Sequence, residues 1–145
     1  MISRWHRAAP WLLAALLGGA GTLHFLAPRP FETLVPEELP GSQRAWVLAS
    51  GVAELGCAVA VAVPASRRRG GWASAALFCA VFPGNVQMAL DGGARGVNGV
   101  LGSAAVAWAR LPLQVPLVVW AMGVARRAGD SGGTAGTGRV STTPT

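Results

Sequence analysis

The sequence carries little charge and no lysine. Aspartate, glutamate, lysine and arginine together make up 12% of its 145 residues, and all 12 basic residues are arginine. The formal net charge of +6 does not indicate nucleic-acid binding, because that function needs basic residues gathered on one soluble face and interleaved with aromatics. Here the arginines stand between long apolar segments instead. The sequence therefore predicts no nucleic-acid partner.

Residues that bind metals or act as nucleophiles are also scarce. Cys57 and Cys79 both lie inside apolar segments and form neither a CxxC pair nor a metal-ligand spacing, and no second histidine or cysteine stands at metal spacing from His24. No nucleophile lies beside a base, and no glycine-rich phosphate loop follows a strand. We therefore expect no metal site and no catalysis by this chain alone, and the sequence requires no cofactor.

Isoleucine occurs once, at Ile2, whereas alanine, glycine and valine dominate. Together with arginine in place of lysine, this usage is what a GC-rich coding sequence produces, and it predicts a bacterial source. Apolar residues make up 52% of the chain, and the mean hydropathy is +0.44. An ordinary soluble domain of this length is less apolar, so we expect one membrane domain.

Four apolar segments are long enough to cross a bilayer, which takes about 20 helical residues. The predicted spans cover about residues 8–27, 45–63, 71–90 and 108–125. The fourth is irregular, because Arg110 and Pro112 interrupt the apolar run that begins at residue 100. One interpretation is a short helical or interfacial piece before the main span. The other is a single longer helix kinked at Pro112 and Pro116.

The arginines are divided unevenly between the two sides of these spans. Eight lie on the side that holds both termini and the connection between spans two and three, and four lie on the other side with most of the acidic residues. The positive-inside rule then places both termini in the cytoplasm, which requires an even number of spans. We therefore predict an all-α membrane protein, a four-transmembrane-helix bundle over residues 1–127, in the bacterial plasma membrane. Residues 128–145 are rich in Gly, Ser and Thr and are predicted to be disordered.

The start of the chain also allows a second interpretation, a cleavable signal peptide. Arg4 and Arg7 would form its basic region, residues 11–17 its apolar stretch and residues 18–20 its cleavage site. The apolar run continues well past that site, which favours a first span. Three later spans would keep the protein in the membrane in either case.

Five short patterns mark the ends or middles of the spans: GTLHF (21–25), FETLVPEELP (31–40), SGVAEL (50–55), VFPGNVQMA (81–89) and RLPLQ (110–114). Taken together and in this order, they resemble the DoxX-like family of small bacterial membrane proteins over about residues 17–125. The resemblance implies a four-helix membrane bundle. It further implies an accessory subunit of a quinone- or thiol-linked membrane redox system. A quinone would then be its ligand, and membrane oxidoreductase subunits would be its partners within the lipid bilayer.

The residues themselves predict a polar cluster in the outer half of the bundle, made of His24, Glu54, Asn85, Arg110 and Gln114. At about 1.5 Å per helical residue, Glu54 lies roughly 12 Å below the outer end of its span. A charge at that depth is costly, so we expect Glu54 to face the interior and either to pair with Arg110 or to be protonated. The cluster is then either an outward-open pocket for a small molecule or headgroup, or a polar lock that only fixes helix packing.

Several of these residues also have simpler interpretations. His24 near the interface is more often a packing residue than a ligand. Asn85 follows Pro83 and Gly84, so its side chain can satisfy carbonyls that the proline leaves without a donor, and Gln114 is similar. Five glycines near these residues are expected to allow close helix approach: Gly18, Gly19, Gly21, Gly51 and Gly56.

Two further features complete the pattern. Cys57 and Cys79 come to nearly the same depth on adjacent helices, close enough to touch, and we interpret them as inert buried thiols. Residues 31–39 alternate apolar and acidic side chains between prolines. This segment is either an amphipathic lid over the pocket or a rigid connector, and the prolines favour the connector.

Three functions are therefore compared. The first is the DoxX-like accessory subunit with a quinone or lipid-like ligand, and the second is a non-enzymatic membrane scaffold. The third, a minimal transporter, is disfavoured because four short spans give little room for the paired repeats that alternating access generally uses.

Overall fold

The computed structural model describes residues 2–37, 39–94 and 97–133. The elements are α1 (Ile2–Leu26), α2 (Arg29–Glu32), α3 (Gln43–Ala62), α4 (Arg67–Leu90), the 3-10 turn η1 (Val100–Gly102) and α5 (Ala104–Gly133). Within these ranges the chain forms no strand, and one isolated β-bridge joins Gly93 to Ser103. The predicted all-α class is confirmed.

Four helices are long and apolar enough to cross a membrane: residues Arg7–Leu26 of α1, all of α3 and α4, and Ala104–Asp130 of α5. Their outward faces are apolar as well, since large side chains such as Leu26 (76% exposed) and Val115 (66% exposed) lie on the surface of the bundle. Exposed apolar surface on this scale is costly in water and favourable in lipid. The fold is that of a multi-pass membrane protein.

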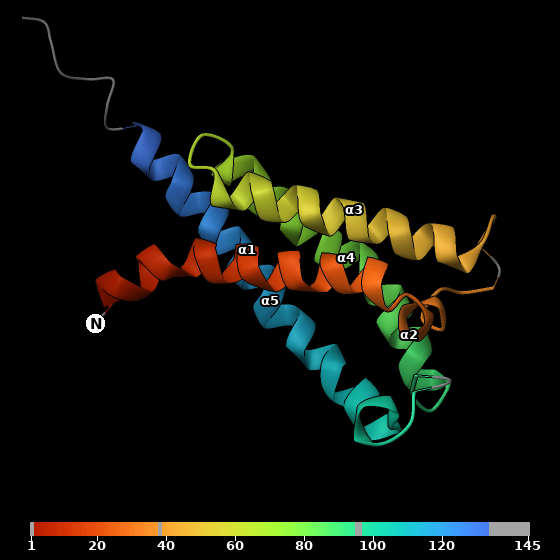
Figure 1. Cartoon of the computed structure of the whole chain (residues 1–145). Coiled ribbons are helices and arrows are strands. Elements are labelled where there is room, and N and C mark those ends of the chain that lie inside the picture. The colour runs from red at the N-terminus through yellow and green to blue at the C-terminus, as the bar shows by residue number, and fades with distance from the viewer. Residues whose placement is uncertain (1, 38, 95–96, 134–145) are drawn as a thin grey trace, which may run out of the picture.

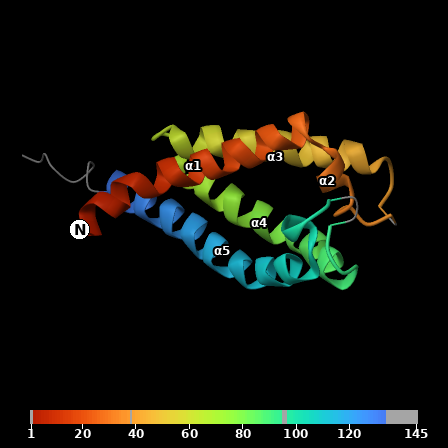
Figure 2. The ribbon, with the colours of Figure 1, turned by 60° about the horizontal axis from the view of Figure 1, so that its bottom comes forward.

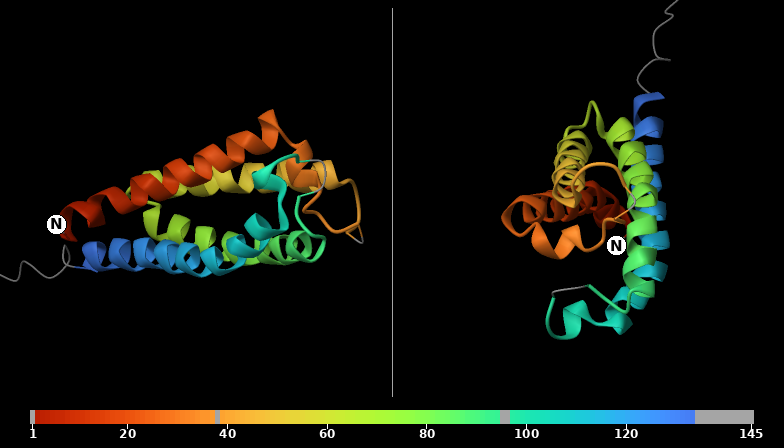
Figure 3. Two further views of the ribbon diagram at one scale, coloured as in Figure 1. Left: turned by 90° about the horizontal axis from the view of Figure 1, so that it is seen from below. Right: turned by 90° about the vertical axis from the view of Figure 1, so that its right-hand side faces the viewer.

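The helices form two pairs. α1 packs along α3 and α4 packs along α5, α3 and α4 join the pairs, and α1 touches α5 over a short stretch only. The start of α1, the α3–α4 connection and the end of α5 lie at one end of the bundle, as Figures 1 and 2 show. We call this the arginine-rich end, because the described arginines 7, 67–69, 126 and 127 lie there. α2 and η1 lie at the opposite end, called the α2 end (Figure 3).

The fourth span is one long helix. Ser103 is extended (ψ 154°), and its Oγ accepts the N–H of Val106 at 3.4 Å, so α5 begins at residue 104 rather than 108. Pro112 and Pro116 lie inside α5 without ending it. The helix also continues past residue 127 to Gly133, six residues into the predicted tail, and residues 134–145 of that tail lie outside the described residues.

The turn between α3 and α4 is fixed by the first arginine of α4. The Arg67 guanidinium donates to the carbonyls of Val61 (2.9 Å) and Ala62 (2.8 Å). These are among the last four carbonyls of α3, which accept no hydrogen bond from within the helix. Ser66 Oγ donates to the Ala60 carbonyl at 2.9 Å. These bonds satisfy the C-terminal carbonyls of α3 and hold the two helices side by side.

The arginine-rich half of the bundle is closely packed. Glycines bring the backbones together there, since a Cβ at Gly70 would lie 2.6 Å from the carbonyl carbon of Ala60, and one at Gly71 would lie 2.8 Å from Ala125. The main core occupies this half and draws on all four spanning helices. Its buried members are Ala9, Leu13, Leu17, Cys57, Ala58, Val61, Ala75, Phe78, Ala121 and Val124.

Exposed tryptophans mark both ends of the spanning region. Trp11 and Trp72 lie toward the arginine-rich end, where the Arg67 guanidinium lies 5.8 Å from the Trp11 ring and that of Arg126 lies 6.0 Å from the Trp72 ring. Trp46, near the start of α3, lies toward the α2 end and is also exposed. Tryptophan and arginine are enriched at the two bilayer surfaces, so this distribution fits helices that cross the membrane.

Candidate functional site: a polar cavity between the helix pairs

A cavity of about 550 Å³ lies between the α1–α3 pair and the α4–α5 pair. Most of its wall is apolar and includes Leu17, Val47, Phe78 and Leu117. All five residues of the predicted polar cluster line it: His24, Glu54, Asn85, Arg110 and Gln114. The structure therefore brings together side chains from all four spanning helices at one site.

Two glycines position the first half of this site. A Cβ at Gly21 would lie 2.9 Å from the carbonyl oxygen of Gly51, and a Cβ at Gly51 would lie 2.9 Å from Cβ of His24. Because neither glycine has a side chain, α1 and α3 approach closely at this level. A Cβ at Gly21 would also lie 3.1 Å from Cβ of Glu54, so each glycine leaves room for the ionisable side chain of the opposite helix, and the two side chains meet at the crossing. The expected close approach is confirmed at Gly21 and Gly51 and is wrong at Gly19 and Gly56, where an added Cβ would meet no atom within 4 Å.

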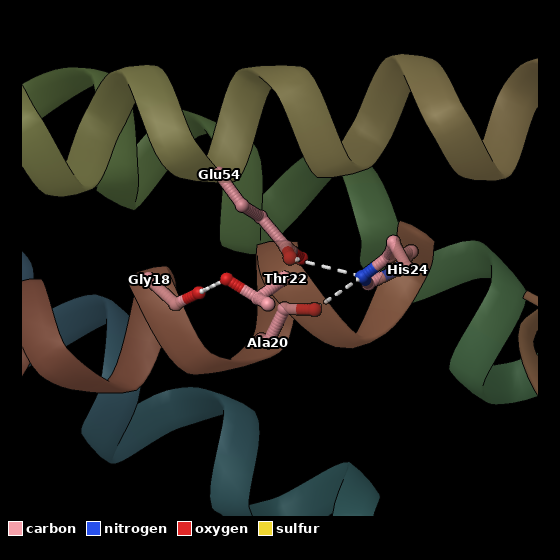
Figure 4. Close-up of polar contacts among 5 residues, drawn as sticks. All are labelled: Gly18, Ala20, Thr22, His24 and Glu54. Carbon is pink, nitrogen blue, oxygen red and sulfur yellow. Dashed lines mark hydrogen bonds and ion pairs between the residues drawn. The ribbon is translucent and has the colours of Figure 1, made fainter. Parts of the chain in front are cut away.

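His24 and Glu54 form an ion-pair contact across this helix crossing. Nδ1 of His24 lies 3.2 Å from Oε2 of Glu54 and 2.7 Å from the carbonyl oxygen of Ala20, as Figure 4 shows. The two side chains are only 10% and 12% exposed. Both atoms that face Nδ1 are acceptors, so Nδ1 carries a proton and the other ring nitrogen, Nε2, is left for another partner.

The expected pair between Glu54 and Arg110 is not present. Among the described residues, Glu54 has its ion-pair contact with His24, and Arg110 is an exposed residue of α5 that lines the cavity. The reason is the Gly21–Gly51 approach, which makes α1 the close neighbour of Glu54, whereas Arg110 belongs to the other helix pair. Glu54 is thus matched by a histidine on its own side of the cavity.

The connection between α1 and α3 covers the cavity at the α2 end. The Phe31 ring stacks on the His24 ring, with centroids 4.1 Å apart and planes 24° apart. The carbonyl oxygen of Leu34 packs against Gly84 of α4, and a Cβ at Gly84 would lie only 2.8 Å from that oxygen. The side chain of Gln43 donates to the Val35 carbonyl at 3.0 Å. This segment is held by contacts with α1, α3 and α4. It is a connector with fixed contacts, and it also forms part of the cavity wall.

Amide side chains link α4 to α5 on the opposite wall. Nε2 of Gln114 donates to the Phe78 carbonyl, and Nδ2 of Asn85 donates to Oε1 of Gln114 at 3.4 Å. Pro83 removes the donor for the neighbouring carbonyl, that of Cys79, so the helix is weakened at this level. The expected bond from Asn85 to a carbonyl freed by Pro83 is not formed: Asn85 bonds to Gln114, and Gln114 bonds to the carbonyl of Phe78, one residue before Cys79.

Among the lining residues outside the predicted cluster, Ser50 adds a hydroxyl and Phe31 stacks on His24. Ser50 lies four residues before Glu54 on α3, and this helical spacing places it on the same face, so the sequence held a signal for it. Phe31 lies in the FETLVPEELP pattern, but its stacking on His24 depends on how the connection folds back and has no local signal. Cys57 is buried in the main core as expected, whereas the expected burial of Cys79 is wrong, because this residue is exposed on α4; both are free thiols.

The arrangement provides one histidine–glutamate pair, one arginine, two amides and a hydroxyl inside an apolar wall. No group of three or more histidine, cysteine, aspartate or glutamate side chains in the described part of the chain could hold a metal ion. Such a cavity is suited to binding a molecule with an apolar body and a polar head.

Fold and site together define a class: a four-span helical membrane protein with a polar cavity in one half of the bundle. The chain belongs to the family described as domain of unknown function DUF8561, whose model matches residues 13–125. No curated protein and no solved structure matches the chain.

Proposed function

We propose that this protein binds a small amphipathic molecule in its cavity, as a DoxX-like accessory subunit of a quinone- or thiol-linked redox system in the bacterial plasma membrane. One observation carries the binding function: the polar side chains expected to cluster from four separate helices line one cavity of about 550 Å³. Small-molecule sites typically have volumes of about 300–1,000 Å³ and combine apolar walls with a few convergent polar groups. The redox role rests on the sequence resemblance.

The direct test is purification of the full chain in a mild detergent, followed by mass-spectrometric identification of bound quinones, lipids and proteins. We expect a stoichiometric small molecule in the wild-type protein and its loss from a Ser50→Phe variant, which fills the cavity without removing any charge. Val52→Phe is the matched control, because Val52 is on the same helix and 62% exposed. Equal ligand content in both variants would contradict a site in the cavity. Co-purifying oxidoreductase subunits would support the redox role, and their absence would count against it.

A non-enzymatic scaffold is the second candidate, and one observation favours it. The bonds from Asn85 to Gln114 and from Gln114 to the Phe78 carbonyl join α4 to α5, as a polar lock would. If the cluster only locks the helices, then no bound molecule should be found in the wild type or in Ser50→Phe. A bound molecule recovered from the wild type but not from Ser50→Phe would exclude this alternative.

We also propose that both termini face the cytoplasm, which the arginine distribution supports. Single cysteines at Ser42 and Ser66, in a Cys57→Ala, Cys79→Ala background, test this orientation with an impermeant thiol reagent in intact cells. Ser42 precedes α3 at the α2 end, and Ser66 precedes α4 at the arginine-rich end. The cysteine at position 42 should react and the one at position 66 should not. The reverse pattern would place the termini outside.

A further inference from the structure

We infer that the cavity selects an acidic amphiphile, a molecule with an oxyanion head and an apolar chain. This inference rests on the proposed binding function and adds the chemical class of the ligand. It follows from the charge of the cavity lining, from the hydrogen-bond donors that the lining offers, and from the position of its apolar wall.

Three of the residues that line the cavity are ionisable: His24, Glu54 and Arg110. His24 and Glu54 face each other at 3.2 Å and are both largely buried. An uncompensated buried charge is costly, so the pair is neutral overall, either as imidazolium with carboxylate or as imidazole with carboxylic acid. Arg110 keeps its charge at any physiological pH. The lining therefore carries one net positive charge, which an anion complements.

The hydrogen-bonding groups point to the same ligand. Nδ1 of His24 is engaged by Ala20 and Glu54, which leaves Nε2 as the remaining ring nitrogen. Nε2 donates in the imidazolium form and accepts in the imidazole form, so Arg110 is the donor that both forms of the pair leave to a ligand. Arg110 has only donors, and no described residue forms an ion pair with it. A carboxylate or phosphate head is built of acceptors, and charge-assisted bonds to such oxygens are stronger than neutral ones.

The rest of the ligand must be apolar. The wall between the helix pairs consists largely of leucine, valine and aromatic side chains. Two residues of this wall, Leu16 and Trp46, are 44% and 43% exposed, so the wall continues onto the outer surface of the bundle. That surface faces lipid in a spanning helix, and an acyl chain can lie along it while the head reaches Arg110.

Trp46 provides the measurement, because it lines the cavity and bromine quenches tryptophan fluorescence at short range. We propose titrating the purified protein in a neutral detergent with a brominated stearic acid, its methyl ester and the corresponding primary amine. Quenching that is lost in Trp46→Phe reports the cavity. The acid should bind about tenfold or more tightly than the ester or the amine, the difference expected from one charge-assisted contact. This comparison needs no charge variant.

Arg110→Gln should bring the affinity for the acid down to that for the ester while leaving the affinity for the ester unchanged. Arg44→Gln is the matched control, because Arg44 is an exposed arginine at the start of α3, on the α2 end, and is not among the lining residues. Equal affinities of the wild type for acid, ester and amine would overturn the acid preference but leave the proposed binding site intact. No quenching that depends on Trp46 would overturn both.

Competition identifies the source of the oxyanion. Unlabelled stearic acid and phosphatidic acid should each be tested against the brominated acid. Displacement by stearic acid alone assigns the site to free fatty acids. Displacement by phosphatidic acid as well would show that the site also binds bilayer lipids. Either result supports an oxyanion head. Displacement by neither, together with displacement by the methyl ester, would contradict the inference.

Discussion

The two halves of the bundle differ in how their helices meet. At the arginine-rich end, Gly70 and Gly71 bring three helices into backbone contact, and the main core fills the space between them. Toward the α2 end, α1 and α3 stay in contact through Gly21 and Gly51, but the two pairs enclose a cavity. The smaller second core, formed by Met88, Ala89 and Ala107, joins α4 to α5, and Leu34 of the connection between α1 and α3 packs against it.

This difference shows how a small membrane protein can hold a cavity open. In lipid, helix association depends on packing and hydrogen bonds, since burial of apolar surface gives little advantage over contact with acyl chains. The tightly packed half fixes the position of all four helices, so the other half does not need to close. The polar groups there have partners within the site: His24 and Glu54 form an ion-pair contact, although Oε2 of Glu54 accepts no hydrogen bond, and the amides of Asn85 and Gln114 bond to each other and to α4.

The largest effect is expected from a substitution that separates the backbones at the packed end. In Gly70→Ala the new Cβ would lie 2.6–2.9 Å from atoms of Ala60 and Val61, two of which belong to the backbone and cannot rotate away. We expect a loss of about 1–3 kcal/mol in the free energy of unfolding in detergent. Thermal denaturation followed by circular dichroism would show it as a lower midpoint.

The matched control is Gly56→Ala on α3, where an added Cβ would meet no atom within 4 Å. Alanine is the better helix former by about 1 kcal/mol, so this variant should be neutral or slightly more stable. Equal losses in the two variants would contradict the packed contact at Gly70.

Much of the fold could be predicted from the sequence, because the lengths of the apolar segments and the positions of the arginines directly indicate where the membrane-spanning helices lie. The start of α5 could not be predicted so well. Its first turn depends on the Ser103 cap, and Pro112 and Pro116 favoured a later start or a kink. Prolines are tolerated inside membrane helices because neighbouring helices can bond the freed carbonyls, which no single segment of sequence reveals.

The candidate site was predictable in its membership and less so in its pairing. Depth along each helix placed His24, Glu54, Asn85, Arg110 and Gln114 at similar levels, and all five line the cavity. The depth of a residue along its helix does not give the direction in which its side chain points around the helix axis. It also does not give which helix packs against that side chain. Glu54 therefore contacts His24 through the Gly21–Gly51 approach, although Arg110 had the more obvious charge.

A smaller effect should separate these two pairings. A double-mutant cycle of His24→Phe and Glu54→Gln should show a coupling energy of about 0.6 kcal/mol, with an upper limit of about 1.7 kcal/mol, as is typical for polar pairs between membrane helices. The cycle of Arg110→Leu with Glu54→Gln should be additive, because Arg110 and Glu54 form no ion pair in the structure. Coupling in the second cycle and none in the first would show that Glu54 pairs across the cavity.

The smallest effect is expected at Cys79, and the two cysteines compare a packed with an unpacked position. Cys57 is buried in the main core and Cys79 is exposed on α4. Cys57→Ala leaves a small void among close neighbours and should cost about 1 kcal/mol, whereas Cys79→Ala should stay within about 0.5 kcal/mol of the wild type. A thiol reagent soluble in the detergent should modify Cys79 first, because only its side chain lies on the surface. Faster modification of Cys57 would mean that the packed half opens more readily than expected. A larger loss of stability from Cys79→Ala would mean that Cys79, and not Cys57, is the packed residue.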